Sequence, residues 1–246
     1  MAFDPQDVAA RRWGQARAVD QAQIDVGLRQ HMLGVYNYMA SGLLLTGIVA
    51  YAIAGWAMTD ANVAYMLFGT PLKWVIMLAP IGLVFFLAAR IHAMSATTAQ
   101  ATYWIYAALM GLSLSSVFLV LTGTSIARVF FITAGTFGAM SLYGYTTQRD
   151  LTAVGSFLWM GLIGIIIASI VNLFIASSAL QFAISVIGVI VFVGLTAYDT
   201  QSIKEMYLES DDRDTASKKA IYGALQLYLD FINIFMSLMS LFGDRR

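Results

Sequence analysis

The sequence contains no cysteine, few charges and only three prolines, and each shortage excludes a class of protein. Without cysteine the chain forms no disulfide, uses no thiolate in catalysis and binds no metal through sulfur. Its two histidines are far apart and make no metal-ligand set. Charged residues make up 11% of the chain and the formal net charge is zero, so no nucleic-acid partner is expected. No Pro-rich linker divides the chain into separate domains.

What the sequence has in abundance is apolar residues, which make up 59% of the chain. They gather in seven runs, and a helix needs roughly 20 such residues to cross a bilayer. The runs lack the period-two alternation of barrel strands, which favours helices. The sequence therefore predicts an all-α integral membrane protein, a bundle of seven transmembrane helices. The runs are His31–Trp56, Trp74–Ala89, Ala99–Thr122, Val129–Thr146, Val154–Ala176, Leu180–Asp199 and Ala220–Phe242.

The polar ends of the chain indicate its orientation. Residues 1–30 form a predicted cytoplasmic tail, followed by the seven-helix domain over residues 31–246. If the runs alternate across the bilayer, all but four of the 14 Lys and Arg residues fall on the side of this tail, which the positive-inside rule makes cytoplasmic. The exceptions are Lys73, Arg128, Arg245 and Arg246. The length of the last run favours a full crossing with the C-terminus opposite, and a re-entrant segment stays open.

Two aspartates stand where carboxylates are costly. Asp199 ends the sixth run, and Asp230 lies about ten residues into the seventh, roughly 15 Å deep. If the sixth helix continues through Met206 and Leu208, the midpoint between the aspartates falls near Asp214, inside the acidic loop. The two carboxyl groups are then level in an antiparallel hairpin and can share one proton. Such a pair predicts a pH sensor and, when deprotonated, hard oxygen ligands for Ca²⁺.

Other polar residues accompany the pair. Gln226, Asn233 and Ser237 share one face of the last helix with Asp230. They predict either the lining of an ion path or hydrogen bonds that only hold helices together. Arg90 closes the second run on the same side as Asp199, where it either pairs with that aspartate or extends to the membrane surface.

The segments Tyr198-Asp199-Thr200-Gln201 and Leu227-Tyr228-Leu229-Asp230-Phe231-Ile232-Asn233 resemble the Bax inhibitor family, in particular its bacterial branch. The resemblance extends from the first run to Phe242. It implies a seven-helix fold with the last helix central, wrapped by the other six. It also implies a pH-sensitive calcium leak, in which Asp199 and Asp230 latch a cytoplasmic gate and Arg90 holds them. Some members carry an acidic residue in the second helix, and Trp74–Ala89 has none.

The resulting expectation is a calcium leak of the bacterial inner membrane that is not an enzyme, needs no cofactor, and meets lipid, Ca²⁺ and protons. A proton-coupled transporter or a non-conducting regulator of another membrane protein uses the same carboxylates and stays open. An intramembrane aspartyl protease is a more distant alternative. Tyr198-Asp199 matches its first motif, but Asp230 follows Leu229 where such enzymes have Gly-x-Gly-Asp.

Overall fold

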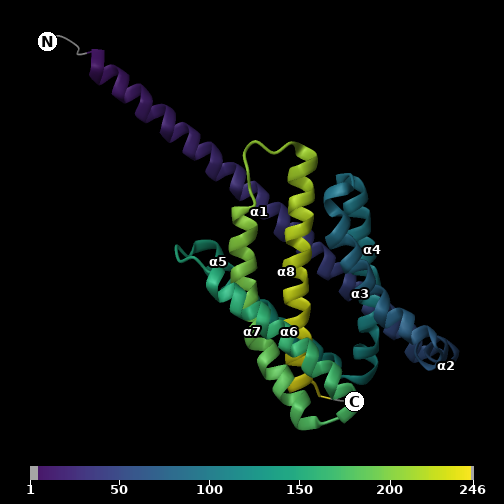
Figure 1. Cartoon of the computed structure of the whole chain (residues 1–246). Coiled ribbons are helices and arrows are strands. Elements are labelled where there is room, and N and C mark those ends of the chain that lie inside the picture. Colours follow the sequence, from purple (N-terminus) through teal and green to yellow (C-terminus); the bar gives the residue numbers. More distant parts are fainter. Residues whose placement is uncertain (1–4, 245–246) are drawn as a thin grey trace.

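The computed structural model describes the backbone of residues 5–244 and the side chains of residues 26–244. Its ordered elements are helices (Figure 1). They are α1 (Pro5–Thr59), α2 (Ala61–Ala64), α3 (Leu72–Arg90), α4 (Ala96–Val120), α5 (Gly123–Thr146), α6 (Thr152–Ile175), α7 (Ser178–Glu205) and α8 (Arg213–Phe242), with a π-turn over Tyr65–Gly69 and a 3₁₀ turn over Ile91–Ala93.

The predicted seven-helix membrane architecture is confirmed, because seven helices of the described chain are long and apolar enough to cross a bilayer. Several helix ends differ from the sequence prediction, and those next to the predicted tail and the acidic loop bear on the site. α1 continues without a break across residues 30 and 31, where the tail was predicted to end. α7 ends at Glu205 rather than continuing through Leu208, and α8 begins at Arg213, so the acidic loop is confined to residues 206–212. Arg245 and Arg246 lie outside the described residues.

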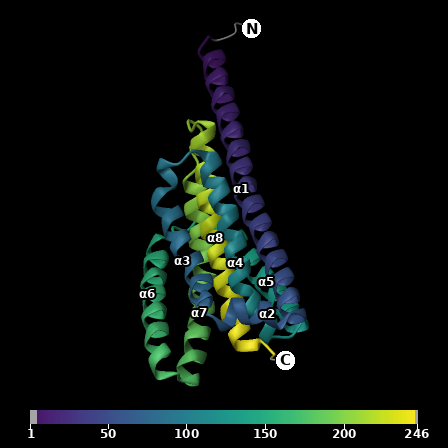
Figure 2. The same cartoon turned by 90° about the vertical axis from the view of Figure 1, so that its right-hand side faces the viewer.

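The last helix lies at the centre of the bundle. α8 packs against α1, α4, α5 and α7. In its most apolar 18-residue stretch 56% of the residues are buried, against 33% or less in the corresponding stretches of the other spans. The expectation that all six other helices wrap it is only partly met, since α3 packs chiefly on α4 and α6 on α7. Figure 2 shows α3 and α6 at the edge of the bundle opposite α1. α8, which carries the polar side chains, therefore has less contact with lipid than the other spans.

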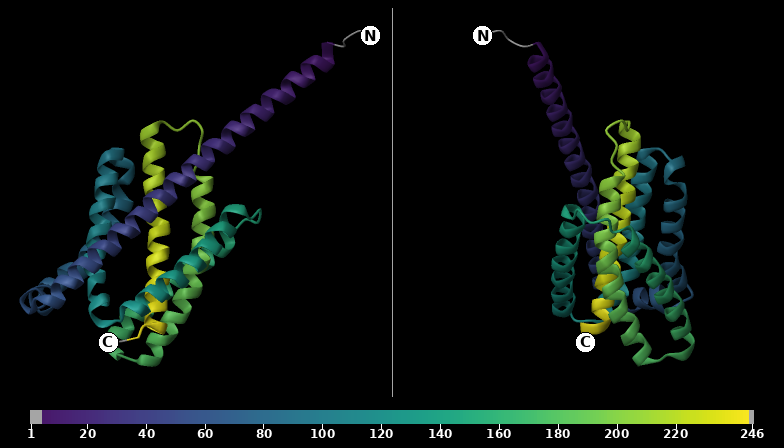
Figure 3. Two further views of the ribbon diagram at one scale, coloured as in Figure 1. Left: turned by 180° about the vertical axis from the view of Figure 1, so that it is seen from behind. Right: turned by 60° about the vertical axis from the view of Figure 1, so that its left-hand side comes forward.

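Close helix contacts occur where a side chain is missing. A Cβ atom on Gly144 of α5 would lie 2.2 Å from the carbonyl oxygen of Ala197 in α7, and one on Gly111 of α4 would lie 2.6 Å from that of Thr46 in α1. Lipid gives helices no hydrophobic reason to associate, so such close backbone approach supplies much of the attraction. These contacts fix how α5 meets α7 and how α1 crosses α4 (Figure 3).

Candidate functional site

The site begins with the register between α7 and α8. At the end of the α7–α8 hairpin away from its loop, Ser185 donates a hydrogen bond of 2.8 Å to Ser240. Near its loop, Lys219 donates one of 2.9 Å to the carbonyl oxygen of Met206. Both pairs are centred between residues 212 and 213, which places the backbones of Asp199 and Asp230 within about one helical turn of the same height. The predicted centre near Asp214 is therefore close to the observed one but lies after it in the chain, and Asp214 is in the first turn of α8 and not in the loop.

Asp199 and Asp230 meet in the interior. Each side chain is 4% exposed, and the two carboxyl groups are hydrogen-bond partners. An ionised carboxylate only accepts hydrogen bonds, so a bond between two of them requires a proton on one. The remaining oxygens, Oδ1 of Asp199 and Oδ2 of Asp230, are buried without a partner in the described structure. Two carboxyl groups in this arrangement can share one proton, and each keeps an oxygen that can accept a further hydrogen bond.

Both aspartates line a cavity of about 850 Å³ bounded by α3, α6, α7 and α8. Three other predicted residues, Gln226, Asn233 and Ser237, line it as well. Asn233 donates a 2.8 Å hydrogen bond to the carbonyl oxygen of Leu229, whereas the Oε1 atom of Gln226 is buried without a partner. The polar face of α8 thus borders a hollow space beside its contact with α7.

The cavity has polar residues that the sequence reasoning missed. Gln181 and Ser185 of α7 and Ser240 of α8 line its end away from the α7–α8 loop and are joined by hydrogen bonds. Ser240 continues the spacing of three and four that runs from Gln226 through Ser237, and Gln181 and Ser185 are four residues apart. These periodicities were the available signal. Together the residues make a polar stripe along the α7–α8 seam.

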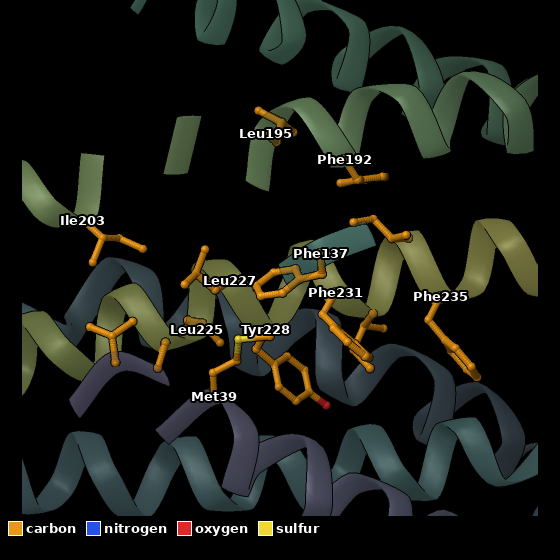
Figure 4. Close-up of a cluster of buried hydrophobic side chains, with 14 of the residues drawn as sticks. Met39, Phe137, Phe192, Leu195, Ile203, Leu225, Leu227, Tyr228, Phe231 and Phe235 are labelled. Carbon is orange, nitrogen blue, oxygen red and sulfur yellow. The ribbon is translucent and has the colours of Figure 1, made fainter. Parts of the chain in front are cut away.

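The other end of the cavity is closed by apolar side chains. Between the aspartates and the end of the bundle where α7 joins α8 lie five buried residues from three helices and the 3₁₀ turn: Leu87, Ile91, Ile203, Ile221 and Leu225. None is more than 2% exposed. We call this set the apolar plug. Figure 4 shows Ile203 of α7 and Leu225 of α8 within this core.

Arg90 is not part of the aspartate site. It is exposed at the C-terminal end of α3, and none of the ion pairs among the described residues includes it. Among the described residues, no group of three or more His, Asp or Glu side chains is arranged so that it could hold a metal ion. A cation at the pair would be held by two carboxylates and by neutral oxygens such as that of Gln226.

One exposed aspartate outside the helices, Asp150, differs from the buried pair in its exposure and in its hydrogen bonds. Asp150, in the connection between α5 and α6, is exposed and accepts a 2.8 Å hydrogen bond from the backbone N–H of Thr152. Hydrogen bonds from Thr152 lower the pKa of this carboxyl below its ordinary value, so Asp150 stays ionised at neutral pH.

Comparison with known proteins places this arrangement in a family. The family model described as "Inhibitor of apoptosis-promoting Bax1" matches residues 28–246. The chain belongs to the Bax inhibitor family. It is 51% identical to an uncharacterised protein of Rickettsia prowazekii over 90% of this chain and 92% of that protein. It is 50% identical to the inner membrane protein YbhL of Escherichia coli, covering 89% of this chain and 94% of YbhL.

More distant relatives of this Bax inhibitor family member keep the same extent. An uncharacterised membrane protein of Streptococcus pyogenes is 34% identical over 90% of this chain and 95% of its own length. The family model, which matches residues 28–246, covers the α7–α8 hairpin with its aspartates as well as the rest of the bundle. The chain is a multi-pass membrane protein of this family.

Proposed function

We propose that the protein is a pH-sensitive calcium leak in which Asp199 and Asp230 form the gate. The observation that carries the proposal is the buried aspartate pair in a cavity with a polar stripe along α7 and α8, next to the apolar plug. The polar stripe offers oxygen ligands to a partly dehydrated cation, and the plug closes the route beyond the pair.

The gating step follows from electrostatics. While the pair shares a proton, it carries one negative charge and joins α7 to α8. When that proton leaves, two negative charges stand in contact in a low dielectric and repel each other. Separation of α7 and α8 at the pair loosens Ile203 against Ile221 and Leu225. Flux is therefore expected to rise from acid to alkaline pH.

The membrane and orientation are part of the same proposal. YbhL is called an inner membrane protein, and we place this chain in the bacterial inner membrane with its N-terminus in the cytoplasm, as the Lys and Arg distribution favours. The two ends of the described chain lie at opposite ends of the bundle, which supports a C-terminus on the other side of the membrane (Figure 1). The apolar plug then faces the cytoplasm. The protein acts by transport, without catalysis and without a cofactor.

The proposal is tested by calcium flux into proteoliposomes across a pH series. Native protein is compared with Asp199→Asn and Asp230→Asn, which keep the size of the side chain and remove its titration. We expect flux to rise with pH in the native protein and to lose this dependence in both variants. Asp150→Asn is the matched control, because that exposed carboxylate is already ionised across the range.

Other outcomes point to other functions. Absence of calcium flux at every pH overturns the leak and favours a non-conducting regulator. Proton uptake that requires a second substrate favours a transporter. Peptide cleavage that is lost in both aspartate variants favours an intramembrane protease.

A further inference from the structure

The cavity opens sideways toward lipid. Several residues that line it are also largely exposed on the outside of the bundle, among them Phe85 of α3 at 70%, Ile166 of α6 at 51% and Leu173 of α6 at 81%. They lie on the two helices that pack chiefly on α4 and α7, not on α8. A molecule dissolved in the hydrocarbon layer therefore reaches the cavity between α3 and α6 without passing through water.

The inner wall of the cavity accepts hydrogen bonds and lacks positive charge. Three buried oxygens there have no partner in the described structure: Oδ1 of Asp199, Oδ2 of Asp230 and Oε1 of Gln226. Among the described residues, no Lys, Arg or His lines the cavity. Unpaired acceptors inside a membrane are costly, and a donor-rich cation satisfies all three.

These two features point to one chemical class of ligand. We propose that the cavity binds a single-chain lipophilic primary amine that enters from the bilayer, with its ammonium group at the Asp199–Asp230 pair and its alkyl chain between α3 and α6. The volume of about 850 Å³ lies within the range of roughly 300–1,000 Å³ typical of small-molecule sites. The ammonium group donates up to three hydrogen bonds and neutralises the pair's one negative charge.

The depth of Asp230, measured from the end of the bundle where α8 ends, argues against a phospholipid head group that enters from that side. Asp230 lies 12 residues before the end of α8 at Phe242, about 18 Å along the helix axis at about 1.5 Å per residue. A phosphate-bearing head group stays at the membrane surface, whereas a simple ammonium reaches this depth when a carboxylate pairs with it.

The test is photolabelling of the full chain in lipid nanodiscs with dodecylamine that carries a diazirine at the end of its chain, followed by mass spectrometry. We expect labelled residues on α3 and α6, protected by excess unlabelled dodecylamine and not by dodecanol. The double variant Asp199→Asn, Asp230→Asn should weaken that protection at least about tenfold, because it removes the charge that the ammonium meets, which either aspartate alone can still carry.

Two tryptophan variants keep the test decisive if the aspartate variant folds poorly. Ile166→Trp places bulk at the lateral opening, while Ile167→Trp puts the same bulk on the next residue, which is 57% exposed and does not line the cavity. Labelling should fall in the first variant only. Equal protection by dodecanol, or equal labelling in the two tryptophan variants, overturns the proposal. The inference goes beyond the proposed leak, and its readout involves no ion flux, so either can fail without the other.

Discussion

The two faces of α8 carry polar groups at similar depth, but the polar group on one face is fully hydrogen-bonded and the one on the other face is not. On one face, Tyr228 donates a 2.7 Å hydrogen bond to Thr46 of α1, whose hydroxyl donates in turn to the carbonyl oxygen of Ala107 in α4. On the other face, only two residues along, Asp230 has an unpaired oxygen beside a cavity. Figure 4 shows Tyr228 directed away from Leu195 and Phe192 of α7.

This difference distinguishes polar side chains that hold helices together from polar side chains that are expected to act in transport. The Tyr228 face is packed against α1 and α4, with Tyr103 and Tyr106 in edge contact with its ring. The hydroxyl of Tyr106 lacks a partner there, but it is neutral. An unpaired carboxylate at the same depth costs far more and adds nothing to packing. Substitutions on the packed face should therefore change stability, and those on the cavity face should change transport.

The largest effect is expected on the cavity face. Asn233→Leu replaces a polar group of the stripe by an apolar one, and calcium flux in proteoliposomes should fall about tenfold at every pH, because a permeating ion loses an oxygen ligand. The rise of flux with pH should persist, since Asp199 and Asp230 are intact. Met236→Leu, at another position lining the cavity, conserves volume and is the control. Equal loss of flux in both variants contradicts a polar path.

At the contact between α4 and α1, on the side of the packed face, Gly111→Ala should lower the free energy of unfolding by about 1–3 kcal/mol. The new methyl group collides with the Thr46 carbonyl and the side chain of Val49. Gly164→Ala on lipid-facing α6 meets nothing within 4 Å and should leave stability unchanged or slightly raised. Denaturant unfolding in detergent measures both. If the two variants unfold alike, close backbone contact between α1 and α4 is not what stabilises this face.

A smaller effect is expected for the hydrogen bond between Thr46 and Tyr228. A double-mutant cycle with Thr46→Val and Tyr228→Phe should give a coupling energy of about 0.6 kcal/mol, typical of such bonds between transmembrane helices. Unfolding free energies supply the cycle. Calcium flux and its pH dependence should remain native in both single variants, and a flattened pH profile in Tyr228→Phe would show that this face takes part in gating.

The smallest effect is expected at Arg90. Because this side chain forms no ion pair in the described structure, Arg90→Gln should leave the pH dependence of flux unchanged. The same proteoliposome assay decides the matter. A shift of the profile would mean that Arg90 reaches the aspartates in another conformation of the gate, as the family resemblance implies.

Much of the site was accessible from the sequence, and the exceptions are instructive. The height of Asp199 relative to Asp230 followed from counting residues around a turn, and the spacing of Gln226, Asn233 and Ser237 placed them on one face. The pairing of Arg90 could not be decided, because a long flexible side chain at a helix end reaches several positions. Gln181 and Ser185 were missed because their importance depends on Ser240, which lies more than 50 residues away.

The sequence alone determined the number of crossings, the depth of the two aspartates and the polar stripe of α8. These properties depend on hydrophobic length and helical period, which are local. Only the tertiary structure decided that α3 and α6 stay at the edge of the bundle, and that their separation leaves a cavity beside Asp230 while Tyr228 is packed. Such outcomes depend on how closely particular backbones approach, as at Gly111 and Gly144, and no single segment encodes that approach.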